Sequence, residues 1–285
     1  MTALSGVMTL CSCSEEVLNN KSEGESRLTV VTRADEDSGG TSIAMPVRLY
    51  VFDEEGTCVE TSIQEDTSTP FAIELPEGTY EVYAIGGADE SRLVLPSRED
   101  ARQTTAIALK EGQALGDLMA AHAHATLPAD GSNTVALNMA RKVCLVTDVT
   151  IKNVPEGTEA VSVSIAPLYE SMLLNGSYQG EGGSCTIDLQ KEDEGSDTWK
   201  DLAGNRFLMP SVGKPTITVA IGDATYAYTC EEEMAGNYKI SIEGTYTGKG
   251  GTASIVLSGT ITGVTWEGEE SIHFNFNEEG SDTEK

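Results

Sequence analysis

The residues best suited to covalent chemistry lie at the start of the chain. A short apolar run over residues 3–10 leads into Leu-Cys-Ser-Cys at 10–13, and acidic residues follow at once. An apolar segment before a cleavage site with small residues is typical of a secretory signal, and an aliphatic residue three positions before the modified cysteine marks the lipoprotein form. Leu10 stands three positions before Cys13, whereas it would fill the small position before Cys11. We therefore expect a signal peptide over residues 1–12 and a lipidated Cys13.

Two observations bear on that expectation. No Lys or Arg precedes the apolar run, although a signal peptide normally begins with positive charge, so either the true start lies upstream or the signal is weak. The alternative to a signal is a disordered N-terminal tail with two incidental cysteines. Two or more acyl chains would hold the protein firmly on a membrane. No other segment approaches the ~20 apolar residues of a transmembrane helix. The interpretation we favour is a lipid-anchored protein with an acidic linker over residues 13–26.

Side chains for catalysis or metal binding are sparse. His122 and His124 would share one face of a strand, where two imidazoles can ligate a metal, but no third ligand follows at a diagnostic spacing. The alternative is two histidines on a half-exposed strand. With His273 as the remaining histidine and no Gly-x-Ser-x-Gly motif, a hydrolase triad has few possible bases. The sequence predicts no enzyme, no resident metal and no cofactor.

The charge of the chain limits its partners. It carries 46 acidic and 18 basic residues, a net charge of −28. Nucleic-acid binding requires clustered Lys and Arg that displace counterions, so we expect no nucleic-acid partner. An acidic surface instead resists non-specific association outside a cell.

The other cysteines and the aromatic residues each leave two alternatives. Cys58, Cys144, Cys185 and Cys230 lie far apart and form no Cys-x-x-Cys pair, so they form up to two disulfides in an exported protein or stay free, as a thiol inside the apolar run around Cys144 would. Aromatic side chains either build a platform for sugar stacking or fill cores. The residues concerned are Trp199, Trp266, Tyr169, Tyr178, Tyr226, Tyr228 and Tyr246.

The elements that position these residues are expected to be strands. Apolar residues recur with period two, as at 47–51, 80–84, 161–165 and 217–221, and glycine-rich turns separate the runs, which predicts antiparallel β-sandwiches. Segments 87–103 and 190–206 are expected to be surface loops, the first with room for a short helix. Residues 115–125 have mixed helix and strand character, and we favour a strand.

The length of the chain suggests two domains. We place an N-terminal β-sandwich at residues 27–140, a C-terminal β-sandwich at 141–277 and an acidic disordered tail at 278–285. The segment from Gly78 to Tyr83 is echoed by Gly236 to Ser241, which supports a duplication, although common turn chemistry explains so short a match equally well.

Longer strand patterns resemble a known family. The segment Pro46 to Asp53 followed by Leu75 to Ala84 is similar to the first domain of the fimbrillin-like lipoproteins of Bacteroidales, and Arg141 to Pro155 is similar to the opening of their second domain. The segment Phe207 to Ser211 and the closing Val264 to Trp266 add to the likeness. Within this family the chain most resembles the minor or anchor subunits of FimB type.

The resemblance implies two tandem transthyretin-like β-sandwiches and a place on the cell surface, anchored by lipid in the outer membrane as part of a fimbrium. It implies partners among other fimbrial subunits, joined when a strand of one chain completes a groove in another, in support of attachment and adhesion. The candidate first strand is Arg27 to Thr32, with Leu28, Val30 and Val31 as its apolar residues. A stalk subunit would be cleaved after an arginine, for which Arg33 fits better than Arg48, whereas an anchor would keep this strand. The alternative is a monomeric surface lipoprotein that binds a glycan or a ligand on a host or bacterial surface through its loops.

Overall fold

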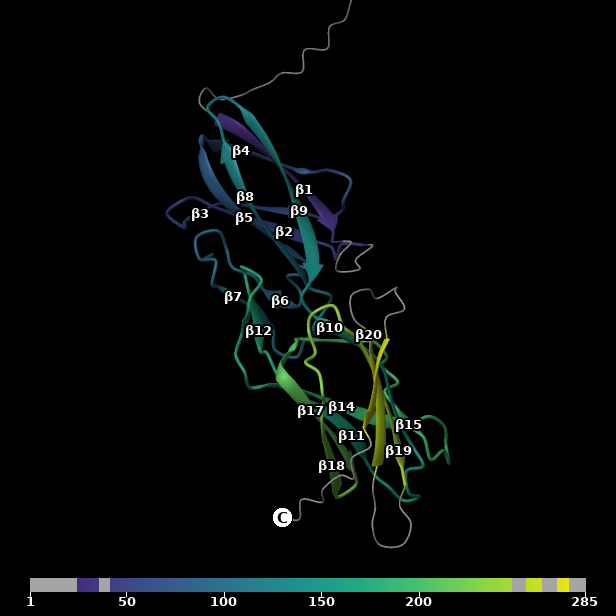
Figure 1. Ribbon diagram of the computed structural model, residues 1–285. Coiled ribbons are helices and arrows are strands. Elements are labelled where there is room, and N and C mark those ends of the chain that lie inside the picture. Colours follow the sequence, from purple (N-terminus) through teal and green to yellow (C-terminus); the bar gives the residue numbers. More distant parts are fainter. Residues whose placement is uncertain (1–24, 36–41, 248–254, 263–270, 277–285) are drawn as a thin grey trace, which may run out of the picture.

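A computed structural model describes residues 25–35, 42–247, 255–262 and 271–276 (Figure 1). The regular elements in these ranges are β-strands, which confirms the expected all-β class. Within the same ranges there is no helix long and apolar enough to span a membrane. The expected signal peptide 1–12, Cys13, most of the 13–26 linker, Trp266 and the 278–285 tail lie outside the described residues.

The N-terminal sandwich is one seven-stranded sheet folded over on itself, in the order β3-β2-β5-β8-β9-β1-β4. The sheet bends back on itself between β8 and β9, which pair only at Met119 with Arg141 and at Ala120 with Ala140. The layer β3-β2-β5-β8 therefore packs against the layer β9-β1-β4. The strands are β1 (Glu25–Ala34), β2 (Val47–Phe52), β3 (Cys58–Gln64), β4 (Phe71–Pro76), β5 (Gly78–Gly86), β8 (Met119–Leu127) and β9 (Ser132–Arg141).

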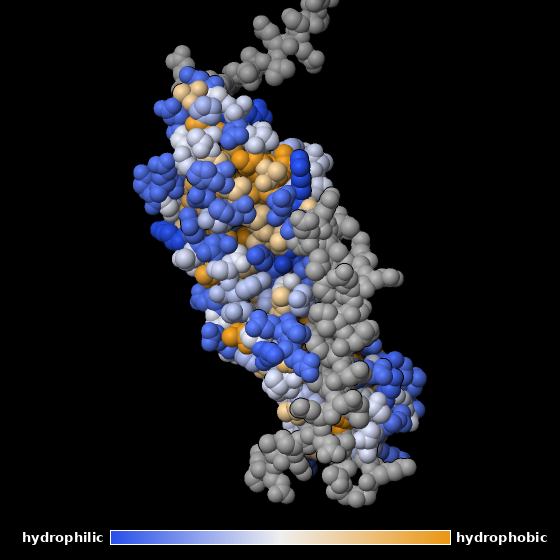
Figure 2. Space-filling model, in the orientation of Figure 1, coloured by the Kyte–Doolittle hydropathy of each residue, from blue (hydrophilic) through white to orange (hydrophobic). Residues whose placement is uncertain are grey.

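Alternation along the strands explains why this sheet folds into a sandwich. In β4, Phe71, Ile73 and Leu75 are buried while the residues between them are exposed. Successive strand residues point to opposite faces, and burying a side chain of this size stabilises the fold by about 1.5–3 kcal/mol. The core between the layers also takes Leu49 and Val51 from β2. Hydrophobic side chains are nevertheless visible among hydrophilic ones on the surface of this sandwich (Figure 2).

The C-terminal sandwich has ten strands, in the order β18-β17-β11-β14-β15-β10-β19-β20-β21 with β16 beside β10. Its core contains side chains from both layers, among them Val163, Ile187, Val219 and Ile242. The strands are β10 (Cys144–Lys152), β11 (Val161–Leu168), β14 (Gly183–Lys191), β15 (Trp199–Lys200), β16 (Arg206–Leu208), β17 (Ser211–Ile221), β18 (Ala224–Thr229), β19 (Lys239–Tyr246), β20 (Ile255–Thr262) and β21 (Ser271–Phe276).

The two sandwiches share one arrangement around their first strands. In the first, β1 has β9 parallel on one side and β4 antiparallel on the other. In the second, β10 has β19 parallel on one side, and β15 and β16 antiparallel on the other. The antiparallel architecture is thus confirmed with one parallel pair per sandwich, which strand periodicity does not predict.

A small sheet joins the two halves. Its order is β13-β12-β7-β6, with β6 (Leu93–Val94) and β7 (Ala106–Leu109) from the N-terminal half and β12 (Ser171–Leu173) and β13 (Tyr178–Gln179) from the C-terminal half. Met172 pairs with Ile107, and both side chains are buried in a core cluster that also contains Tyr83 and Val143. Strands and core therefore both continue across the junction.

The ambiguous segments resolve in favour of strands and turns. Residues 119–127 form β8, as favoured for 115–125, and the 87–103 segment contains β6 and turns rather than a helix. The 190–206 segment is mainly loop but includes β15, whose Trp199 is buried. All four cysteines that the structure describes are free. Cys144 is buried, and burial raises the pKa of its thiol to about 12.

Candidate assembly site

The candidate first strand is an inner strand of its sheet. Leu28 of β1 lies opposite Ile73 of β4 in antiparallel register and beside Asn133 of β9 in parallel register. An inner strand satisfies backbone groups on both of its edges, whereas its loss would leave two rows of unpaired donors and acceptors. The backbone of β1 is therefore paired on both edges within its own sheet.

The apolar residues of β1 divide between its two faces. Leu28 and Val30 are fully buried in the core between the layers. Val31 points to the opposite face and is half-buried, because neighbouring strand residues alternate. Two of the three residues expected to hold this strand therefore lie in the core.

Polar contacts fix both ends of β1. Near its start, Ser26 is buried and its hydroxyl donates to the carbonyl of Pro128, while the Arg27 amide donates to Gly131 at 3.0 Å. Near its end, the hydroxyl of Thr32 donates to Oε1 of Gln64 at 3.1 Å. Sequence spacing does not indicate these partners, because each is at least 32 residues away from the residue of β1 that it contacts.

The two arginines considered as cleavage points both lie in paired strands. The candidate first strand was expected to end at Thr32, but β1 continues through Ala34 and includes Arg33. The side chain of Arg33 is exposed, while its backbone lies beside Asn138 of β9. Arg48 lies within β2, pairs with Glu90 and sits over the ring of Tyr50 at 5.7 Å. A protease would have to open either strand before it could cut.

The histidine pair has a third neighbour that the sequence did not reveal. Nε2 of His122 and Nδ1 of His124 both contact the carboxylate of Glu81 on β5, the second at 3.1 Å. Burial acts to raise the pKa of Glu81, but the hydrogen bonds and charges of the two histidines outweigh it and leave that pKa below its usual value. Within the described part of the chain no cluster of His, Cys, Asp or Glu has the form of a metal site. The trio is an exposed cross-strand contact, found only once the register of β5 and β8 is known.

The aromatic residues that the structure describes do not gather into one stacking platform. Trp199, Tyr226 and Tyr228 are buried in the core of the C-terminal sandwich, and Tyr169 stacks on Tyr178 with ring centroids 5.0 Å apart. The burial of Trp199, Tyr226 and Tyr228 favours the core-filling alternative.

Comparisons with solved structures support this architecture. The fimbrial anchor protein Mfa2 from Porphyromonas gingivalis is 16% identical, with a TM-score of 0.65 over 87% of this chain and 99% of that one. A Bacteroides ovatus protein provisionally described as an adhesin is 13% identical, with a TM-score of 0.60 over 92% of this chain and 98% of that one. A Bacteroides thetaiotaomicron protein provisionally described as polysaccharide-binding is 14% identical, with a TM-score of 0.60 over 85% of this chain and 99% of that one.

The family assignment comes from sequence. No curated protein matches the chain. The family model for fimbrillin-A associated anchor proteins matches residues 18–270, which include both sandwiches up to β20. This confirms the resemblance to fimbrial anchor subunits, a family of structural proteins rather than of enzymes. The chain belongs to the family of fimbrillin-A associated anchor proteins Mfa1 and Mfa2.

Proposed function

We propose that this protein is a non-enzymatic fimbrial subunit, of anchor or minor type, held in the outer membrane through a lipid on Cys13 and exposed on the cell surface. Its partners are other fimbrial subunits, and its role is to attach the fimbrium and to support adhesion. The family match supports association with fimbriae, and the leader sequence supports the lipid anchor. The mature chain on this proposal starts at Cys13, with β-sandwiches at 27–140 and 141–277.

The observation that carries the anchor role is the match to the anchor family over residues 18–270, and the pairing of β1 in the uncut chain agrees with it. Leu28 and Val30 are fully buried and β1 is paired on both edges, so this strand completes its own sandwich. A subunit that keeps β1 cannot accept a strand there. It is suited to end a fibre at the membrane, with its N-terminus bound to lipid, rather than to continue the fibre by accepting a strand in place of β1.

Mass spectrometry of the native protein tests this proposal. The protein would be purified from the outer membrane of its own bacterium under mild conditions, and the mature N-terminus determined on intact protein and on peptides. We expect an acylated Cys13 joined to an uncut β1, in complexes that contain other fimbrial subunits. A free N-terminus at Ala34 in high-mass assemblies would identify a polymerising subunit instead, and an acylated monomer free of other subunits would identify a surface-binding lipoprotein.

A further inference from the structure

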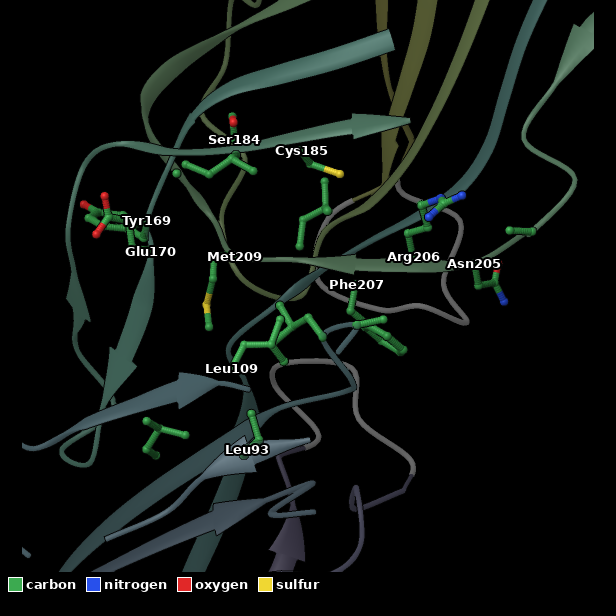
Figure 3. A pocket seen from close by; sticks show the side chains of 17 residues that line it. Leu93, Leu109, Tyr169, Glu170, Ser184, Cys185, Asn205, Arg206, Phe207 and Met209 are labelled. Atoms are coloured by element: carbon green, nitrogen blue, oxygen red, sulfur yellow. The ribbon is translucent and has the colours of Figure 1, made fainter. Parts of the chain in front are cut away.

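A cavity of about 610 Å³ lies where the C-terminal sandwich meets the small joining sheet. Figure 3 shows Ser184 and Cys185 of β14 on one side of it, with Phe207 of β16 across from them. The volume is within the range of protein ligand sites. The chemistry of its walls therefore decides what it can hold.

The cavity exists because β14 and β16 diverge. At one end, Gln190 and Lys191 of β14 pair with β15, which pairs in turn with β10. Farther along, β16 takes over beside β10, but β14 does not pair with it. From Cys185 to Asp188, β14 pairs with β11 on one edge, and no described strand pairs with the other edge. The backbone groups of that edge can receive a further strand.

The floor and lip of the cavity are apolar. Its lining includes the buried Ile107, Leu168 and Leu208, and Leu109 remains 40% exposed. Beside the lining residue Ala203, Leu202 is 56% exposed. An open strand edge above an apolar floor is the arrangement in which an extended peptide adds a strand and inserts alternate side chains.

The charged side chains at the mouth of the cavity determine whether a basic or an acidic segment is favoured there. The guanidinium of Arg206 is neutralised by Asp201, with Nε at 2.5 Å and Nη2 at 2.9 Å from its carboxylate oxygens. The carboxylate of Glu170 has no ionic or hydrogen-bond partner among the described side chains, and the whole chain carries a net charge of −28. Glu170 is therefore the one charged lining residue that no described partner neutralises, which favours a basic segment over an acidic one.

We propose that the slot between β14 and β16 accepts an extended, basic segment of a partner subunit, with apolar residues at alternate positions, as an added strand on β14. The proposal rests on the proposed function, because it takes the occupant from a fimbrial partner. It places a contact in the C-terminal sandwich, apart from the seat of β1. An anchor that keeps its own first strand thereby has a second surface with which to hold a neighbour.

A synthetic peptide with the sequence of residues 27–34, acetylated and amidated, provides a probe of this chemistry. It alternates Leu28, Val30 and Thr32 with other residues and carries two arginines and no acid. Binding to the full-length protein would be measured by isothermal titration calorimetry. Two control peptides have the same sequence, and each is N-methylated at every second residue, with a different set of residues in each peptide. Each control, or twin, keeps the side chains but loses the backbone hydrogen-bond donors along one edge of the strand. We expect the parent to bind and at least one twin to bind more than tenfold more weakly.

Variants of the protein locate the binding. Ala114→Trp and Ala203→Trp fill the cavity from exposed lining positions and should each abolish binding, whereas Ala72→Trp, at an exposed position of β4, should not. Thermal unfolding would confirm that each variant folds. Glu170→Gln should weaken binding about two- to fivefold, and the nearby Glu181→Gln should not.

Several results would overturn the inference. Absence of parent binding, equal binding of both twins, or binding that survives both filling variants would exclude strand addition in this slot. Binding of n-octanol that the filling variants block, without binding of the peptide, would identify a small-molecule pocket. In the native bacterium, normal fimbrial attachment with folded Ala114→Trp and Ala203→Trp proteins would refute the slot as an assembly contact and leave the proposed function standing.

Discussion

Arg141 and Asp117 form an ion pair where the chain passes from the first sandwich to the second. Nε of Arg141 lies 3.1 and 3.0 Å from the two carboxylate oxygens of Asp117. The side chains are only 8% and 19% exposed. Burial raises the pKa of Asp117 and the arginine opposes that rise. The last residue of β9 is thus held by the segment that precedes β8.

Removal of one partner should therefore be costly. We expect Asp117→Asn to lower the free energy of unfolding by about 3 kcal/mol, because it leaves the buried arginine without its charge partner. Lys152→Gln, which breaks the exposed pair with Glu243, should cost less than about 1 kcal/mol. Urea unfolding measures both. Equal effects of the two substitutions would show that the junction pair has no special role.

The period-two pattern predicts the strands well because it reports which face each residue buries. It does not report which strands pair, so the parallel partners β9 and β19 and the joining sheet are seen only in the structure. The echo between Gly78–Tyr83 and Gly236–Ser241 illustrates this limit. It falls on β5, whose neighbours are antiparallel, and on the start of β19, which is parallel to β10, so it does not mark the shared arrangement.

The sequence predicted the candidate site only in part, as it did the fold. The apolar alternation identified β1 through Leu28 and Val30, but the strand extends beyond Thr32 because β9 continues beside it as far as Met139. No local sequence pattern indicates the slot between β14 and β16. It depends on Leu109 and Leu168, about sixty residues apart, meeting across the joining sheet.

The packing of β1 in the core can be tested directly by truncating one of its buried side chains. We expect Leu28→Ala to lower the free energy of unfolding by about 3 kcal/mol, because it leaves a cavity in a fully buried site. Leu202→Ala makes the same change at a side chain that is 56% exposed and should cost less than about 0.5 kcal/mol. Chemical denaturation followed by circular dichroism measures the difference. Similar small values would mean that β1 contributes little to the sandwich.

Contact with the two histidines makes Glu81 a source of acid sensitivity. Its pKa is lower in the folded protein than in the unfolded chain, so its contribution to stability is present above the unfolded pKa and is lost as the pH falls through the folded pKa. We expect Glu81→Gln to make the loss of stability below about pH 4.5 shallower. Glu74→Gln, at an exposed position of β4, should leave the slope unchanged. Unfolding series between pH 6 and pH 3, on the order of one unit apart, would measure it, and an unchanged slope for Glu81→Gln would contradict the expectation.

Protease resistance at Arg33 follows from the same pairing that buries β1. Arg33 has an exposed side chain, but its backbone is paired with β9, so trypsin can cut there only when β1 opens. Arg98 lies in an exposed turn outside the strands and should be cut first in the native protein.

If opening of β1 is fast relative to cutting, the rate of cleavage at Arg33 follows the population of the open form. Leu28→Ala should then raise that rate about 100-fold, since 1.4 kcal/mol is a factor of about ten, while the rate at Arg98 stays constant. Mass spectrometry of timed digests would report both sites, and a wild-type protein cut at Arg33 as quickly as at Arg98 would show that β1 is not held in its seat.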